Sequence, residues 1–212
     1  MRVRAETSYD KENPEHRVLL KSLWAASFPD DEPPSGSSVR SSKWRELGYQ
    51  GDDPTRDFRS TGLLSLDLIL YLAKERPLLY DKLRFRDRHG GGGQLSGGPE
   101  DGYPFAAATV NVTAMLAEIM GAREAAGQRR RGRKLPLDAA GKALAALAAE
   151  TEGGLGEVFC AAVDLLDRKF AETGAGHMQF PSVLKEVRRI VHKELSRMPR
   201  TTGDLERSLG RA

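Results

Sequence analysis

"LLSLDLILYLAKE", residues 63–75, opens with the most apolar run of the chain, residues 63–72. Leucine and isoleucine would cover nearly every side of a helix here, and the run is longer than most strands and poor in valine. Pro77 follows two residues later, so we expect the helix to end before it. We therefore predict a buried helix at this position. Asp67, the acidic residue in the middle of the run, must face a polar pocket or an exposed edge, because an unpaired buried carboxylate is costly.

Helical patterns recur on both sides of this run. Asn13 and Pro14 suit the start of a helix over residues 13–28. No segment is rich in strand-forming residues. We predict a single compact all-α domain of about five to seven helices. Besides a short helical turn at 41–47, the other predicted helices cover residues 104–121, 137–150, 157–172 and 180–198.

The domain organisation follows from composition. "PDDEPPSGSS", residues 29–38, has the proline, glycine and serine content of a linker. We expect flexible insertions near residues 86–102, which include four consecutive glycines, and near 123–137, which carry a basic cluster. The predicted domain covers 13–198. It leaves an N-terminal tail at 1–12 and a polar tail at 199–212, which we expect to be frayed.

Bulk properties indicate a soluble protein. The chain has 212 residues and a formal net charge of +3. Its single cysteine, Cys160, lies in an apolar helical pattern and is expected to be a buried, inert thiol. The first ten residues lack a signal-peptide core, and the apolar run at 63–75 is too short to span a bilayer. We expect a cytoplasmic location.

The sequence supports few common chemistries. None of the four histidines pairs with cysteine or carboxylate at metal-ligand spacing, so we predict no metal and no cofactor. "HGGGG", residues 89–93, lacks the lysine and hydroxyl residue of a phosphate-binding loop. The basic cluster "RRRGRK", 129–134, has no interleaved aromatics to stack bases, so we predict no nucleic-acid partner. A weak contact of this cluster with an anionic membrane stays open.

One segment has a dense and specific pattern. "SSKWRELGYQGDDPTRDFRSTG", residues 41–62, leads directly into the apolar run. From its tryptophan it reads Trp, three residues, Gly-Tyr-Gln, three residues, Pro, two residues, Asp-Phe-Arg, two residues, Gly. This strongly resembles the signature of the ELMO (engulfment and cell motility) domain family. The matching positions are Trp44, Gly48, Tyr49, Gln50, Pro54, Asp57, Phe58, Arg59, Gly62, Leu66 and Tyr71.

The resemblance extends over about residues 13–198. "GYPFAAATVNVTAML", residues 102–116, is similar to the central segment of the family, and the last two predicted helices are similar to its closing helices. Two positions depart from the pattern. Arg56 replaces a threonine and Ser60 replaces a glycine. If the backbone at Ser60 has positive φ, it is strained by about 1 kcal/mol or more.

The resemblance implies a role in small-GTPase regulation. One branch of the family consists of GTPase-activating proteins for Arf and Arf-like GTPases and keeps the motif arginine. The other consists of scaffolds that partner DOCK-type exchange factors and lacks it. Because Arg59 is present, the resemblance favours the activating branch, with Arg59 as an arginine finger on a GTP-bound Arf-family partner. The alternative is a non-catalytic adaptor that binds a GTPase or exchange factor through the same surface. Either role suits the cytoplasm, at the periphery of endomembranes.

The remaining motif residues are expected to support Arg59 or to bind the partner. Trp44 and Pro54 have the character of packing residues. Asp57 is better suited to bracing the loop by accepting backbone N–H groups than to acting as a base. Gln50 either orients the loop or forms an ordinary loop hydrogen bond. Sequence physics alone leaves open that Arg59 forms a structural salt bridge or lies on a solvated face.

Overall fold

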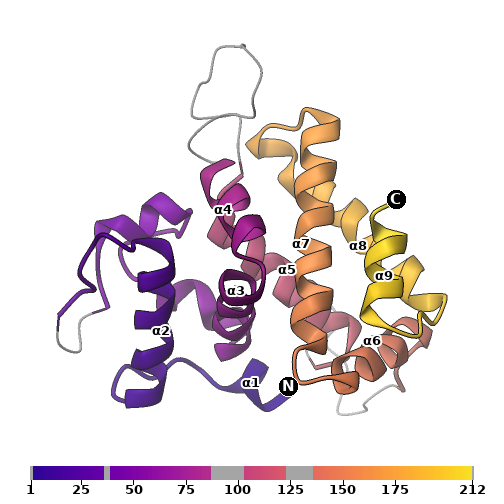
Figure 1. Cartoon of the computed structure of the whole chain (residues 1–212), viewed down its shortest axis with the longest axis horizontal. Helices are drawn as coiled ribbons and strands as arrows, with labels where there is room; N and C mark the ends of the chain where they lie inside the picture. Colours follow the sequence, from indigo (N-terminus) through magenta and orange to yellow (C-terminus); the bar gives the residue numbers. More distant parts are fainter. Residues whose placement is uncertain (1, 36–38, 87–102, 123–135, 212) are drawn as a thin grey trace.

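The computed structural model describes residues 2–35, 39–86, 103–122 and 136–211 (Figure 1). Within these ranges the chain forms nine α-helices, three 3-10 helices and no β-strand. The predicted all-α class is confirmed, but the predicted number of five to seven helices is too low. The α-helices are α1 (Arg2–Glu6), α2 (Pro14–Ser27), α3 (Leu63–Glu75), α4 (Pro77–Arg86), α5 (Phe105–Ile119), α6 (Ala139–Glu150), α7 (Gly154–Thr173), α8 (Phe180–Ser196) and α9 (Thr202–Leu209). The 3-10 helices are η1 (Ser42–Leu47), η2 (Pro54–Ser60) and η3 (His177–Gln179).

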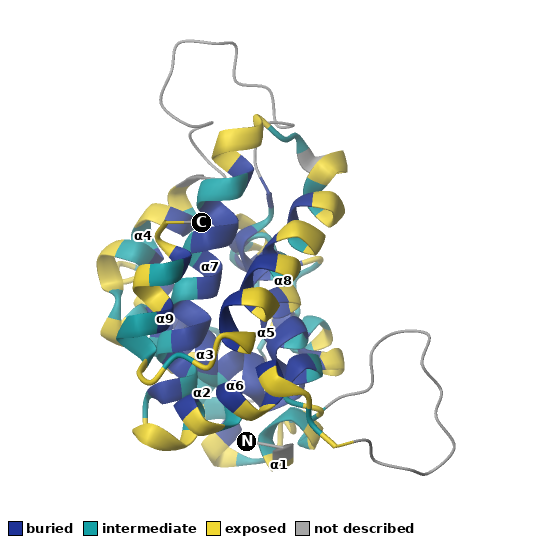
Figure 2. Cartoon of the chain, turned by 90° about the vertical axis from the view of Figure 1, so that its right-hand side faces the viewer, coloured by how far each residue is buried: buried dark blue, intermediate teal, exposed yellow. Residues whose placement is uncertain are grey.

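Helix α3 lies in the middle of the fold. Figure 1 shows α2 on one side of it and α7 to α9 on the other, and α3 also contacts α1, α4 and α5. Eight of its 13 residues are buried, among them Leu63, Leu66 and Leu72, which are fully inaccessible. Figure 2 shows how the buried positions gather along the inner faces of the helices. The apolar run at 63–75 is therefore the central core helix that its composition predicts.

Asp67 lies at the exposed edge of α3, as expected. Its side chain is 30% exposed and forms an ion pair with Arg4 of α1. The Arg4 Nε donates to Asp67 Oδ2 at 2.6 Å, and Nη2 of the same guanidinium donates to Oδ1. The carboxylate thus has two charge-assisted hydrogen bonds, which offset the cost of its partial burial.

The C-terminal tail is not frayed, and that prediction is wrong. Helix α9 packs against α7 and buries Leu205 and Leu209. Its start is a capping box, in which the Thr201 side chain accepts from the Asp204 N–H and the Asp204 side chain accepts from the Thr201 N–H. Two further helices, α1 and α4, were not predicted. Pro77 ends α3 but also opens α4, because proline fits the first turn of a helix.

The glycine-rich stretch and the basic cluster 129–134 lie outside the described residues. The two predicted insertions, near 86–102 and 123–137, fall almost wholly there, so their flexibility stays a prediction. In the part of the chain that the structure describes, no helix is both long and apolar enough to cross a bilayer.

A buried carboxylate joins segments from both sides of residues 87–102. Asp167 of α7 is fully buried. It accepts a hydrogen bond of 3.0 Å from the Tyr103 hydroxyl, and Lys82 Nζ of α4 lies 3.1 Å from its second oxygen. Because a buried charge needs a partner, these contacts hold α4 and the start of the Tyr103–Phe105 segment against α7.

Cys160 is a buried thiol, as the sequence predicts. Burial raises its pKa to about 12. Since a thiolate is the reactive form, we expect native protein at pH 8 to react with a thiol reagent about 10³-fold more slowly than an unstructured cysteine. Absorbance-monitored labelling in buffer and in denaturant measures this ratio. Equal rates in the two conditions would contradict the expectation.

Candidate functional site

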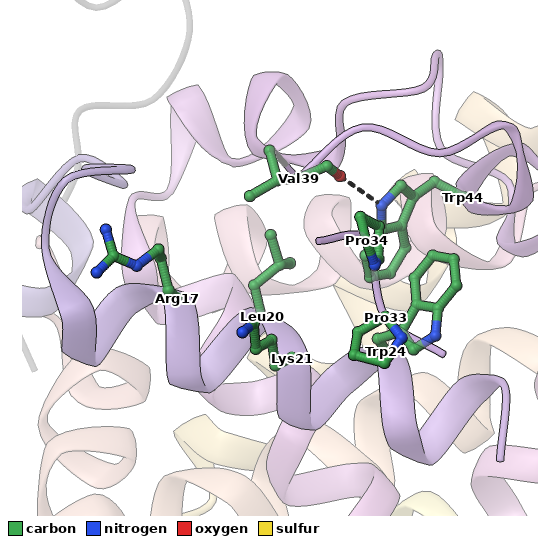
Figure 3. A pocket seen from close by; sticks show the side chains of 8 residues that line it. All are labelled: Arg17, Leu20, Lys21, Trp24, Pro33, Pro34, Val39 and Trp44. Atoms are coloured by element: carbon green, nitrogen blue, oxygen red, sulfur yellow. Dashed lines mark hydrogen bonds between the residues drawn. The ribbon is translucent and has the colours of Figure 1, made fainter. Parts of the chain in front are cut away.

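The segment that precedes α3 rests on a row of aromatic rings. Trp24 of α2 contacts Trp44, Trp44 contacts Tyr49, and Tyr49 contacts Phe58, each edge to face at centroid distances of 5.1, 5.6 and 5.9 Å. The Trp44 Nε1 donates to the Val39 carbonyl at 2.8 Å (Figure 3). Such ring pairs add about 0.5–1.5 kcal/mol each beyond simple burial. They form a stiff base below η1 and η2.

A small apolar cleft lies on the outer side of this base. Figure 3 shows Leu20, Trp24, Val39 and Trp44 around it, with Arg17 and Lys21 also lining it. Its volume is about 20 Å³, which is room for about one water molecule. We therefore do not treat it as a ligand site.

At two positions of the motif, 48 and 62, the structure requires glycine. Gly48 ends η1 with φ of 81°, and a Cβ there would lie 2.7 Å from Pro104. Gly62 has φ of 55° and ψ of −149°, and a Cβ there would lie 2.5 to 2.8 Å from three carbonyl oxygens, those of Thr7, Arg4 and Ala5. A side chain at either position would be strained and would clash with backbone. Both glycines allow the motif to pack closely against other segments.

Helix η2 carries the candidate finger. Asp53 caps it, accepting from the Thr55 N–H at 3.1 Å and the Thr55 hydroxyl at 2.6 Å, and the buried Pro54 occupies its first turn. Residues three apart lie above one another in a 3-10 helix. Arg56 and Arg59 therefore share a face, and both are exposed, while Phe58 is buried below them. This alignment was not predicted, because the segment shows no sustained helical period.

The two arginines border a groove of about 580 Å³. Its lining combines residues from three parts of the chain, and we call it the arginine groove: Ser8, Tyr9, Arg40, Asp53, Thr55, Arg56, Phe58 and Arg59. Within the described ranges, neither Arg56 nor Arg59 forms a salt bridge. Three guanidinium groups and one carboxylate lie in its lining, so positively charged side chains outnumber negatively charged ones there. Sequence reasoning missed Ser8, Tyr9 and Arg40, which carry no local signal of their proximity to the motif.

Asp57 braces the loop that leads to the groove. The backbone N–H of Gln50 faces its carboxylate and lowers the pKa of that group, while the Gln50 side chain itself is exposed. The second carboxylate oxygen, Oδ2, is buried without a hydrogen-bond partner among the described residues. Burial raises the pKa of Asp57 above its ordinary value and outweighs the effect of the Gln50 N–H. The contact with Gln50 fits the expected acceptor role.

The raised pKa of Asp57 has a consequence for stability. A carboxyl whose pKa is raised by folding contributes stability below its unfolded pKa, and this contribution is lost as pH rises through the folded pKa. At pH 7 the charged Asp57 therefore costs stability. We expect Asp57→Asn, which keeps an acceptor for Gln50, to melt at the same or a higher temperature than wild type at pH 7. This advantage should vanish below roughly pH 4.

Melting curves by circular dichroism at several pH values test this expectation. A melting temperature that Asp57→Asn lowers at pH 7 but not at pH 4 would show instead that the charge is stabilising.

Ser60 is not strained. Among the described non-glycine residues, Met198 alone has positive φ. The departure from glycine at this position is therefore accommodated in ordinary backbone, and the expected strain near Arg59 does not arise. Arg56, the second departure, is exposed on the same face as Arg59.

Comparisons with known proteins agree with the motif. Residues 1–184 match the ELMO/CED-12 family. The chain is 26% identical over 182 residues to the ELMO domain-containing protein C of Dictyostelium discoideum, covering 86% of this chain and 27% of that protein. It is 32% identical over 113 residues to the human ELMO domain-containing protein 2, covering 53% of this chain and 34% of that protein. The chain thus spans about a third or less of these relatives. The family match covers most of its length, and the chain belongs to the ELMO/CED-12 family.

Proposed function

We propose that this chain is a GTPase-activating protein for small GTPases of the Arf family and that Arg59 is its arginine finger. The observation that supports this most is the placement of Arg59. Its side chain is exposed, lines the arginine groove, and comes from a 3-10 helix packed on the aromatic row. A finger needs this combination of an accessible guanidinium and a stiff base.

For GTP hydrolysis on the partner, the main catalytic group that this chain must supply is the Arg59 guanidinium. In GTP hydrolysis a water attacks the γ-phosphorus while the bond to the β–γ bridging oxygen breaks, which leaves GDP and inorganic phosphate. Charge spreads over the phosphate oxygens in the transition state. A guanidinium delivered by a partner offers several donors in a rigid fork and keeps its charge at all relevant pH values. Such a finger accelerates hydrolysis by about 10³ to 10⁵.

The other motif residues act in support of this step. Phe58 and the aromatic row hold η2, Asp57 braces the loop, and Gly62 lets the chain turn into α3. Arg56 adds positive charge beside Arg59, which favours encounter with an acidic partner surface. The chain thereby acts on a GTPase and needs no substrate pocket of its own.

A non-catalytic adaptor is the second candidate. Arg56, which replaces the threonine of the family pattern, enlarges the basic surface of the arginine groove and would serve docking equally well. In that role the groove holds a GTPase or an exchange factor without changing its chemistry. The basic cluster at 129–134 is a proposed weak contact with an anionic membrane in both cases.

Single-turnover GTP hydrolysis on a panel of Arf-family GTPases, with and without the protein, tests the proposal. We expect acceleration of about 10³-fold or more on at least one member. Binding to a GTP-loaded member without acceleration of any member would favour the adaptor instead.

A further inference from the structure

The N-terminal segment, residues 2–10, is part of the candidate site. It was predicted to be a tail, but it packs beside the turn that joins η2 to α3. The Leu63 N–H donates to the Thr7 carbonyl at 2.9 Å, and the carbonyls of Arg4, Ala5 and Thr7 crowd against Gly62. Ser8 and Tyr9 of the same segment line the arginine groove. The groove therefore has one wall from this segment and another from η2.

The segment is fastened near both of its ends. Near its start, Arg4 forms the two-point ion pair with Asp67 of α3. At its end, the Asp10 N–H donates to Nδ1 of the buried His16 at 2.9 Å. Between these points the segment is held by the backbone contact at Leu63. Arg4 and Asp67 are 37% and 30% exposed, so the ion pair is accessible and contributes little to the core.

The ion pair is linked to the finger through a short backbone path. Asp67 holds Arg4, and the residues after Arg4 place the Thr7 carbonyl against the Leu63 N–H. The preceding residue, Gly62, donates its own N–H to the Phe58 carbonyl at 2.7 Å, inside η2. Arg59 is the next residue of that helix. Movement of residues 2–10 would therefore loosen the end of η2 that carries the guanidinium.

We propose that Arg4 and Asp67 are positioning residues of the candidate site. By fastening residues 2–10, the pair completes one wall of the arginine groove and fixes the end of η2, so that Arg59 is presented in a single orientation. The effect on hydrolysis rests on the proposed function, whereas the fastening itself does not. Position matters because a reacting group displaced by about 1 Å loses much of its rate advantage.

Arg4→Ala and Asp67→Ala, alone and together, test the proposal in the full chain. The first readout is hydrogen exchange at the Leu63 amide, whose acceptor belongs to the fastened segment. We expect each single variant to exchange this amide about fivefold faster, which is the upper range for an exposed ion pair. The double variant should be no worse than either single variant, since the two residues act as one contact.

The second readout is stimulated single-turnover GTP hydrolysis at saturating protein. We expect the maximal rate to fall about fivefold in each single variant, with circular dichroism and melting temperature close to those of wild type. Lys11→Ala is the matched control. Its Nζ lies 4.0 Å from Glu12, and both side chains are 71% exposed. This variant removes a positive charge next to residues 2–10 but leaves the Arg4–Asp67 ion pair intact. It should therefore change neither the Leu63 exchange rate nor the maximal rate of hydrolysis.

The outcomes separate the two claims. Unchanged Leu63 exchange in the single variants would overturn the fastening, and with it the positioning role. Faster exchange with an undiminished maximal rate would overturn the positioning role alone. If wild type accelerates no GTPase, the proposed function fails and Arg59 has no reaction to be positioned for, while the exchange data still decide the fastening.

Discussion

Arg59→Ala abolishes stimulated GTP hydrolysis while the fold stays intact: this is the largest functional effect that we expect. A trans-acting finger supplies about 10³ to 10⁵ in rate, so the stimulated rate should fall to the intrinsic rate of the GTPase. The side chain is exposed and forms no salt bridge with a described residue, so the melting temperature should stay close to that of wild type. Single-turnover assays and thermal melts measure the two quantities.

Two companion variants sharpen the Arg59 test. Arg59→Lys should also fail badly, because an ammonium lacks the planar fork of donors. Arg56→Ala is the matched control, since it removes the same group from the same face of η2. It should weaken partner binding modestly, through lost long-range attraction, and leave the saturated rate nearly unchanged. Full activity in Arg59→Ala would show that another arginine acts as the finger, with Arg56 the first to test.

Gly62→Ala should produce the largest loss of stability. The residue combines φ of 55° with ψ of −149°, a region that is nearly exclusive to glycine, and its Cβ would lie within 2.8 Å of three backbone oxygens. The two effects together should cost about 3 kcal/mol or more, which lowers the melting temperature by about 6–12 °C in a domain of this size. Thermal and denaturant unfolding followed by circular dichroism measure the change.

Gly51→Ala is the control for this substitution. No heavy atom lies within 4 Å of the Cβ that it would add, and its φ is not positive. This variant should melt within about 2 °C of wild type, as surface substitutions usually do. A fall of similar size in both variants would mean that the loss in Gly62→Ala comes from glycine removal in general rather than from the clash with residues 4–7.

The sequence predicted those features whose cause is local or whose pattern is long. The buried run at 63–75 and the helix cap at Asn13 belong to this class. The capping box at Thr201 and Asp204 is also a local sequence pattern. Helix α9 was nevertheless missed, because the segment is mostly polar and its two buried leucines, Leu205 and Leu209, did not indicate a packed helix. The role of Pro77 as the first residue of α4 was missed because proline ends one helix and starts another equally well.

The candidate site was only half predictable. The spacing of Arg59, Asp57 and the motif glycines identified the segment, because many residues of the family pattern occur here in the same order and at the same intervals. The shared face of Arg56 and Arg59 depends on a 3-10 helix, whose short period leaves little trace in seven residues. The wall made by Ser8 and Tyr9 depends on contacts across more than 40 residues of chain, which no local pattern reports.

The buried carboxylate of Asp167 bears on how this domain tolerates change in chain length. Lys82 precedes residues 87–102 and Tyr103 follows them, and both bind the same side chain on α7. The two stems are therefore held in place by α7 rather than by whatever sequence connects them. In evolutionary terms, a change of length between Lys82 and Tyr103 leaves both contacts to Asp167, and the packing of α5 on α7, available to the new chain.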